Sequence, residues 1–101
     1  MFDKLMAAQH KAEEIKKRLD TVSVFAEVEN GAIKVTATAN KAITDIAIDP
    51  DFYAQADREE VQELLQTAIN KVLQQAENVS AAEMQSATKD MLGGLGGMFG
   101  A

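Results

Sequence analysis

Apolar and polar residues alternate along residues 22 to 39, a pattern typical of strands that bury one face. The dipeptide Asn30-Gly31 interrupts the alternation and suits a two-residue hairpin turn, because both central positions of that turn need a positive φ. Folding the chain there pairs only apolar residues on one face: Val22 with Ala39, Val24 with Ala37, Ala26 with Val35, and Val28 with Ile33. The turn and the alternation thus predict the same register.

A third strand is expected after a second two-residue turn at Asn40-Lys41, with Asn40 supplying the turn conformation. This turn pairs the second strand with the third: Ala37 opposite Thr44, Val35 opposite Ile46, and Ile33 opposite Ile48. The other sheet face then has Thr38 opposite Ile43, and it is partly apolar because it carries Phe25, Ile43 and Ala47. Pro50 cannot donate to a ladder, so Asp49-Pro50-Asp51 predicts a closing turn that Asp49 caps.

Helical spacing precedes and follows this meander. Residues 2 to 19 predict an amphipathic helix with a heptad seam made of Leu5, Ala8, Ala12, Ile15 and Leu19. A second helix is expected from Asp57, an N-cap with Glu60 at N3. Its apolar stripe is wide enough to cover a sheet: Val61, Leu64, Leu65, Ala68, Ile69, Val72, Leu73 and Ala76. Ser80 to Glu83 forms a second capping box, so this helix either breaks near Asn78 and restarts toward Met91 or runs through.

These elements predict an α+β fold with an N-terminal helix, a three-stranded antiparallel meander, and a C-terminal helix or broken helix pair. Residues 1–92 are expected to form one domain, and 93–101, which hold five of the six glycines, a flexible tail. A domain of 101 residues buries only about 60 to 70% of its extended surface, so a second chain would help. The seam, the partly apolar second sheet face and the two open sheet edges therefore predict a homodimer.

Composition narrows the functional class. Without cysteine, the chain has neither a disulfide nor a thiolate metal site. The N-terminus has charges where a signal peptide would need an apolar core, and no uninterrupted apolar run is long enough to span a bilayer. We therefore expect a cytoplasmic location. His10, the sole histidine, falls opposite the seam, and Asp45, Asp49 and Asp51 lack calcium-loop spacing. No nucleophile, metal or cofactor site is evident, which favours a non-enzymatic protein.

The charges of the first helix are sorted by heptad position. Lys4, Lys11 and Arg18 all fall at position g, with Lys16 at e and Lys17 at f, whereas the acids occupy b and c: Glu13, Asp20 and Glu14. Acids and bases are thus expected on different sides. A basic stripe of this kind can follow a phosphate backbone. The alternative is that these bases stabilise the carbonyl end of the helix or pair with acids of a partner helix. The residues alone leave both readings open.

Several segments together resemble the YbaB/EbfC family of bacterial nucleoid-associated proteins. The matching segments, in order, are Met1-Phe2 with Lys4-Leu5-Met6, Gly31 to Thr36, Ile46 to Pro50, Leu64-Leu65 with Ala68-Ile69-Asn70, and a tail rich in Met and Gly. The resemblance implies a homodimer that binds double-stranded DNA in the nucleoid with low sequence preference. It also implies that the helices contact DNA, which maps onto Lys4, Lys11, Lys16, Lys17 and Arg18, with Lys89 in the C-terminal helix.

The net charge of −6 is the main physical obstacle to DNA binding. Residues 57 to 101 carry seven acids and three bases. A local basic patch would therefore act against an unfavourable global field, and binding should depend strongly on salt. The competing hypothesis is an acidic adaptor dimer that keeps the fold, binds a protein partner, and has little or no affinity for DNA.

Overall fold

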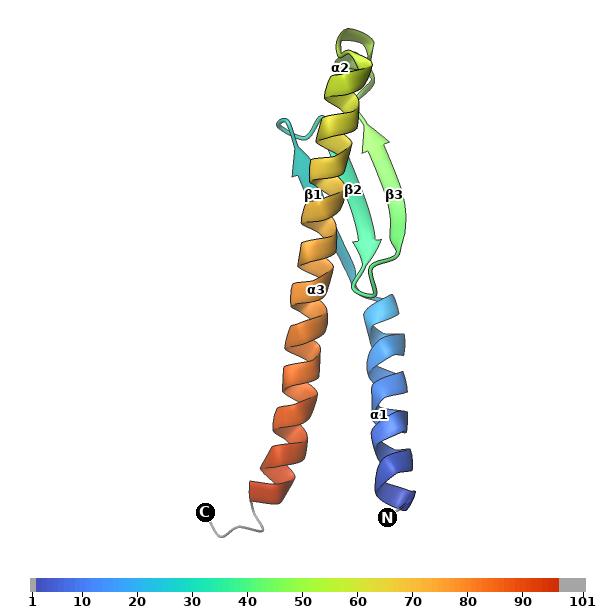
Figure 1. Ribbon diagram of the computed structural model, residues 1–101, viewed down its shortest axis with the longest axis vertical. Coiled ribbons are helices and arrows are strands. Elements are labelled where there is room, and N and C mark those ends of the chain that lie inside the picture. Colours follow the sequence, from blue (N-terminus) through green and yellow to red (C-terminus); the bar gives the residue numbers. More distant parts are fainter. Residues whose placement is uncertain (1, 97–101) are drawn as a thin grey trace.

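The fold is a three-stranded antiparallel sheet with one long helix across it and a second helix beside that long helix (Figure 1). The computed structural model describes the backbone of residues 2–96 and the side chains of residues 6, 7 and 9–87. The elements follow in the order α1 (Phe2–Asp20), β1 (Ser23–Val28), β2 (Ile33–Thr38), β3 (Ile43–Ile48), α2 (Pro50–Gln55) and α3 (Arg58–Gly96). The predicted α+β fold is confirmed. The molecule is elongated, 65 × 27 × 18 Å, because α1 and α3 both extend past one end of the sheet.

The first hairpin has the predicted register. Val28 lies opposite Ile33 and Val24 opposite Ala37. Asn30 and Gly31 have φ angles of 56° and 87°, and the amide of Ala32 donates to the carbonyl of Glu29 at 3.1 Å. Positive φ at both central positions is what a type I′ turn requires, and Asn and Gly reach it at least cost.

The second hairpin corrects part of the predicted register. The left-handed residue is Lys41, with φ 70°, so Asn40 does not supply it. Thr38 donates its amide to the carbonyl of Ala42 at 2.8 Å, which leaves three residues in the loop in place of two. The odd residue is compensated by a bulge: Ala37 lies opposite Ile43, and the next pair is Thr36 with Asp45. The predicted pairs of Ala37 with Thr44 and of Thr38 with Ile43 are therefore wrong, whereas Val35 with Ile46 and Ile33 with Ile48 are confirmed.

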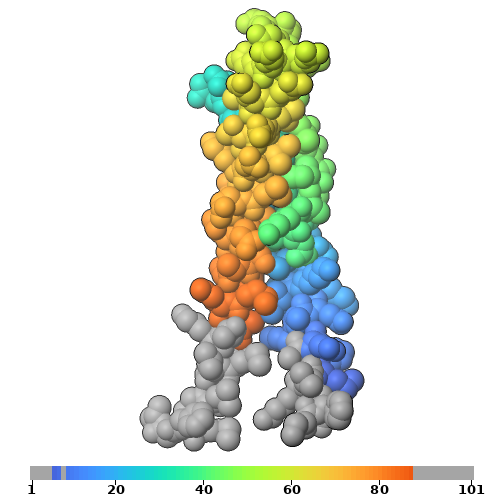
Figure 2. Space-filling model, in the orientation of Figure 1, coloured from blue at the N-terminus to red at the C-terminus, as the bar shows by residue number. Residues whose placement is uncertain are grey.

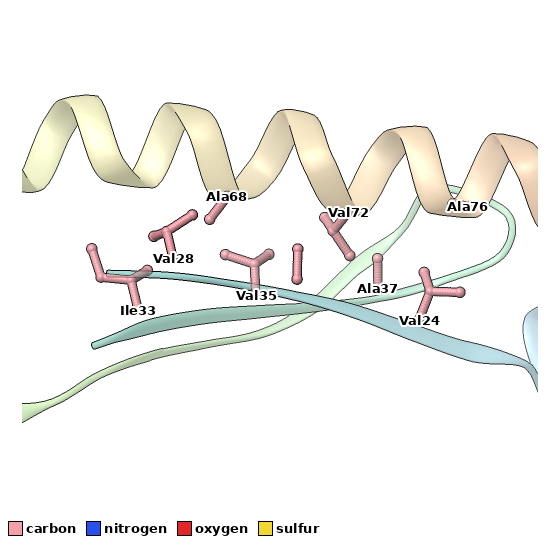
Figure 3. Close-up of a cluster of buried hydrophobic side chains, with 9 residues drawn as sticks. Val24, Val28, Ile33, Val35, Ala37, Ala68, Val72 and Ala76 are labelled. Carbon is pink, nitrogen blue, oxygen red and sulfur yellow. The ribbon is translucent and has the colours of Figure 1, made fainter. Parts of the chain in front are cut away.

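The core lies between α3 and the strands β1 and β2 (Figure 3). Strand residues facing the helix are buried because every second side chain points to that face. The cluster consists of Val24, Ala26, Val28, Ile33, Val35, Ala37, Ala68, Val72 and Ala76. Small residues on α3, Ala68 and Ala76, let the helix backbone approach the sheet closely, and Val72 fills the space between them.

Strand β3 is left beside this core without a covering helix. Its residues Ile43, Ile46 and Ile48, termed the β3 row, pair with Ala37, Val35 and Ile33, whose side chains are fully buried. Cross-strand partners share a face, so the β3 row lies on the same side of the sheet as α3. Yet Ile43 is 40% exposed and Ile46 47%. The bulge thus moves Ile43 off the outer sheet face, where the sequence placed it.

The predicted caps at Asp49 and Asp57 are confirmed, but a short helix follows Asp49 where the sequence predicted only a turn. Asp57 accepts a hydrogen bond from the amide of Glu60 at 3.0 Å at the start of α3. Asp49 accepts one from the amide of Phe52 at 3.0 Å, but it caps the short helix α2 and not merely a turn. Pro50 is the first residue of α2, where its missing N–H costs nothing.

Helix α3 runs through Asn78 without a break and is 39 residues long. The reason is packing: Val79 contacts both the core and a second cluster, and Ala87 is buried in that second cluster. The capping box at Ser80 is therefore overridden by tertiary contacts. The helix also includes residues 93–96, where the sequence predicted the start of a flexible tail. Residues 97–101 of that predicted tail lie outside the described residues.

Candidate nucleic-acid interface

Helix α1 carries the candidate bases away from the sheet (Figure 1). Lys11, Lys16, Lys17 and Arg18 are all exposed. No Gly or Pro interrupts the helix, and Lys17 and Arg18 occupy its last turn, where the carbonyl end of the dipole favours cations. The side chains of Lys4 and Lys89 lie outside the described residues, so their predicted role stays a prediction.

Arg18 is held by an acid of α3. Its Nη2 donates to Oε2 of Glu83 at 2.6 Å, across 65 positions of sequence. The two side chains are 59% and 32% exposed, so water screens the pair, and exposed pairs of this kind contribute only about 0.2–1 kcal/mol. The sequence offered pairing with acids as the alternative to phosphate contact. For Arg18, the structure shows such pairing within one chain.

The remaining bases are not bound in this way. Among the described side chains, Lys11, Lys16 and Lys17 form no ion pair, and the second ion pair joins Lys41 of the β2–β3 turn to Glu77 of α3. Both paired acids belong to α3 and both paired bases lie near the root of α1. The acids of α3 therefore neutralise Arg18 and Lys41 and leave these three lysines to solvent.

The predicted separation of acids from bases on α1 is incomplete. Glu14 lines one shallow hollow together with Lys11, Ile15 and Arg18. The arrangement follows from helix geometry, because Lys11 and Arg18 are three and four residues from Glu14 and such residues are surface neighbours. Heptad position c adjoins position g, so an acid at c weakens the positive field of the g row.

The root of α1 is fixed to the sheet and to α3 by a second apolar cluster. Ile15 and Leu19, 5% and 3% exposed, pack against Ala39 of the β2–β3 turn and Ala87 of α3. The predicted seam is thus confirmed at these two residues, whereas Ala12 is exposed and Leu5 and Ala8 have no described side chains. Figure 2 shows the surfaces of α1 and α3 meeting below the sheet.

Asn40 reinforces this root with hydrogen bonds. Its Nδ2 donates to the carbonyl of Lys16 at 2.8 Å and to Oδ1 of Asp20 at 2.5 Å. The sequence identified Asn40 only as a turn residue and Glu83 only as part of a capping box. Their contacts with α1 were missed, because no local pattern signals a contact between segments so far apart.

Catalytic and metal chemistry find no support in the described part of the chain. His10 is exposed as predicted and lines a shallow hollow with Met6, Gln9 and Glu13. The residues searched contain no group of three or more His, Asp or Glu placed to hold a metal ion. They also contain no helix long and apolar enough to cross a bilayer.

Comparison with known proteins decides the family. The sequence model of the YbaB/EbfC DNA-binding family matches residues 1–91. The chain belongs to this family. A nucleoid-associated protein of Flavobacterium johnsoniae is 34% identical over 97% of this chain and 91% of the relative. Another nucleoid-associated protein, from Ruminiclostridium cellulolyticum, is 35% identical over 90% of this chain and 78% of the relative.

A solved structure shows the same fold as this family member. An uncharacterized protein from Helicobacter pylori superposes with a TM-score of 0.72 at 17% identity, over 89% of this chain and 90% of the other. The fold and the family predicted from the sequence are therefore confirmed.

Proposed function

We propose that this protein is a non-enzymatic, nucleoid-associated homodimer of the cytoplasm that binds double-stranded DNA with low sequence specificity. Membership of a DNA-binding family supports the ligand class. The observation that carries the proposal is the set of three exposed lysines on α1 that no described acid pairs: Lys11, Lys16 and Lys17. Lysine ammonium groups contact phosphates as point charges and read no base sequence, so low specificity follows.

The helix geometry suits a phosphate contact. Lys11 and Arg18 are seven residues apart, which places them on one side of α1 about 10 Å from each other along the axis. Lys4 extends the same row by one heptad, and Lys89 adds a base from α3. Each neutralised phosphate releases condensed counterions, and this release supplies affinity in spite of the net charge of −6.

The β3 row supports the homodimer. Ile43 and Ile46 are exposed beside a fully buried core, and β3 is an edge strand with unpaired backbone groups. An exposed apolar edge is a liability that a second copy of the chain removes by covering it. The two α1 helices of such a dimer would double the number of exposed lysines available to one duplex.

A mobility shift assay over a range of salt concentrations tests DNA binding. The comparison is between the parent chain and Lys11→Glu combined with Arg18→Glu. We expect the parent to bind at low salt and the double variant to lose the shift. The proposal fails if the parent never binds at low salt or if charge reversal changes nothing.

The two ion pairs favour one competing function. Glu77 and Glu83 show that acids of α3 bind cationic side chains, as an acidic adaptor would require of a basic protein partner. The adaptor predicts no DNA shift at any salt concentration. It also predicts a protein partner recovered by the parent chain and not by a variant in which three exposed acids of α3 outside these two ion pairs, Glu59, Glu60 and Glu63, are changed to Gln.

A further inference from the structure

Asn40 occupies the β2–β3 turn but makes its side-chain contacts with α1. Its Nδ2 is 2.8 Å from the carbonyl oxygen of Lys16 and 2.5 Å from Oδ1 of Asp20. An amide nitrogen has two hydrogens, and both oxygens are acceptors, so both donors of Asn40 are used on this one helix. The contact bridges 24 and 20 positions of sequence.

The turn itself does not require asparagine at this position. The left-handed conformation belongs to Lys41, whose φ is 70°. The backbone amide of Asn40 is held by Oγ1 of Thr38 at 3.2 Å, a bond that any residue other than proline could make. The side chain of Asn40 is therefore accounted for by its contact with α1 and not by the hairpin.

The apolar cluster at the same root cannot fix a direction alone. Ile15 and Leu19 share this cluster with Ala39 of the turn and Ala87 of α3, and each of these alanines offers only one methyl group. Apolar burial is proportional to area and has no preferred angle, whereas a hydrogen bond weakens steeply when it bends. The two Asn40 bonds thus add a directional restraint from the sheet, beside the exposed Arg18–Glu83 pair that joins α1 to α3.

We infer that Asn40 is a positioning residue for DNA binding: it fixes the direction in which α1 leaves the sheet, and with it the places of Lys11, Lys16 and Lys17 relative to α3. This inference rests on the proposed function. A helix held in one direction presents its lysines without the ordering cost that a freely pivoting helix would incur on binding.

The isosteric variant Asn40→Asp tests this inference. It keeps the size of the side chain but replaces the donor with a carboxylate, which repels the Lys16 carbonyl and Asp20. The matched control is Asn70→Asp, which makes the same chemical and charge change on the exposed surface of α3. Asn40→Ala serves as a second variant, because it removes both donors without adding charge.

The first measurement follows α1 without DNA. The chain has no cysteine, so single cysteines at Gln9 and Gln85 label α1 and α3 specifically, and dilution with unlabelled protein isolates distances within one chain. Pulsed electron spin resonance should give one narrow distance distribution for the parent and for Asn70→Asp. Both Asn40 variants should give a broad one while circular dichroism shows the fold intact. A narrow distribution in the Asn40 variants overturns the inference.

The second measurement is DNA affinity over a range of salt concentrations. If Asn40 served only to stabilise the fold, its variants would bind DNA like the parent as long as they stay folded. We expect Asn40→Asp to bind about tenfold more weakly than Asn70→Asp near 50 mM salt, with a salt slope smaller by about one phosphate contact. Equal affinity and slope would overturn the positioning role. If the parent itself does not bind, the proposed function fails, and the distance distributions still decide whether Asn40 fixes α1.

Discussion

Arg18 of α1 and Glu83 of α3 form an ion pair at 2.6 Å that joins the two helices beyond the sheet. The pair uses a candidate DNA-binding base and an acid from the most acidic part of the chain. The N–H group of Arg18 that donates to Glu83 cannot donate to a phosphate at the same time. In the proposed complex, the acid would therefore compete with DNA for Arg18.

Replacing this acid should strengthen DNA binding. Glu83→Gln frees Arg18 and removes one repulsive charge, so we expect affinity to rise about three- to fivefold, within the range of one exposed ion pair. The mobility shift assay measures it. Glu77→Gln is the matched control, since it removes the same charge from the same helix but frees Lys41 of the turn. An equal gain in both variants would mean that only net charge matters.

Single lysines should contribute through salt dependence. Lys11→Ala and Lys17→Ala should each lower the slope of log affinity against log salt by about 1, because each loses one phosphate contact. Fluorescence anisotropy with a labelled duplex gives the slope. Lys71→Ala removes an exposed base from α3 and should leave the slope unchanged. Unchanged slopes in the α1 variants would place the DNA elsewhere.

The β3 row should control the oligomeric state. Ile46→Asp puts a charge into the surface that a second copy would cover, so we expect light scattering at micromolar concentration to give the mass of one chain, 10.9 kDa. Phe25→Asp makes a similar change on the outer face, where Phe25 is 53% exposed beneath Lys34. It should leave the dimer intact. The reverse pattern would move the interface to the outer face.

The helix-covered face of β2 should dominate stability. Val35 is fully buried, so Val35→Ala should lower the free energy of unfolding by about 2 kcal/mol through lost burial and a residual cavity. Thr36→Ala, on the other face of the same strand, should cost less than about 1 kcal/mol. Urea unfolding at one fixed protein concentration compares them, since a dimer makes stability depend on concentration. Equal losses would contradict the assigned faces.

The sequence predicted the features of the fold that depend on a few neighbouring residues. It did not predict the loop and the bulge that offset each other at the second hairpin. Asn30-Gly31 and the alternation around it predict the β1–β2 register because both signals act within a few residues. At the second hairpin, a three-residue loop and the extra residue Thr44 cancel each other. The far pairs, such as Val35 with Ile46, therefore match the prediction, whereas the pairs near the turn do not. The alternation of apolar residues cannot reveal a longer loop and a bulge, because their two shifts in register cancel.

The candidate site also has a part that the sequence predicted and a part that it did not. The heptad positions of Lys11, Lys16 and Lys17 outside the apolar seam follow from helix periodicity, whereas the sequence left open whether these lysines pair with acids or face solvent. The contacts of Asn40 and Glu83 with α1 depend on how two helices leave the sheet, which no local pattern determines. The continuity of α3 past Asn78 has the same origin, because it depends on Val79 packing against both apolar clusters.

The unbroken helix α3 connects the sheet core rigidly to the root of α1. Val72 packs against the sheet, and Ala87 packs against Ile15 and Leu19 at the root of α1. Fifteen residues of rigid helix, about 22 Å, separate these two points. A tilt of about 5° at the sheet therefore moves the far end by about 2 Å. If the proposed dimer and DNA contact hold, substitutions in the core, or in the β3 surface where two copies would meet, should thus alter DNA affinity without changing any basic residue of α1.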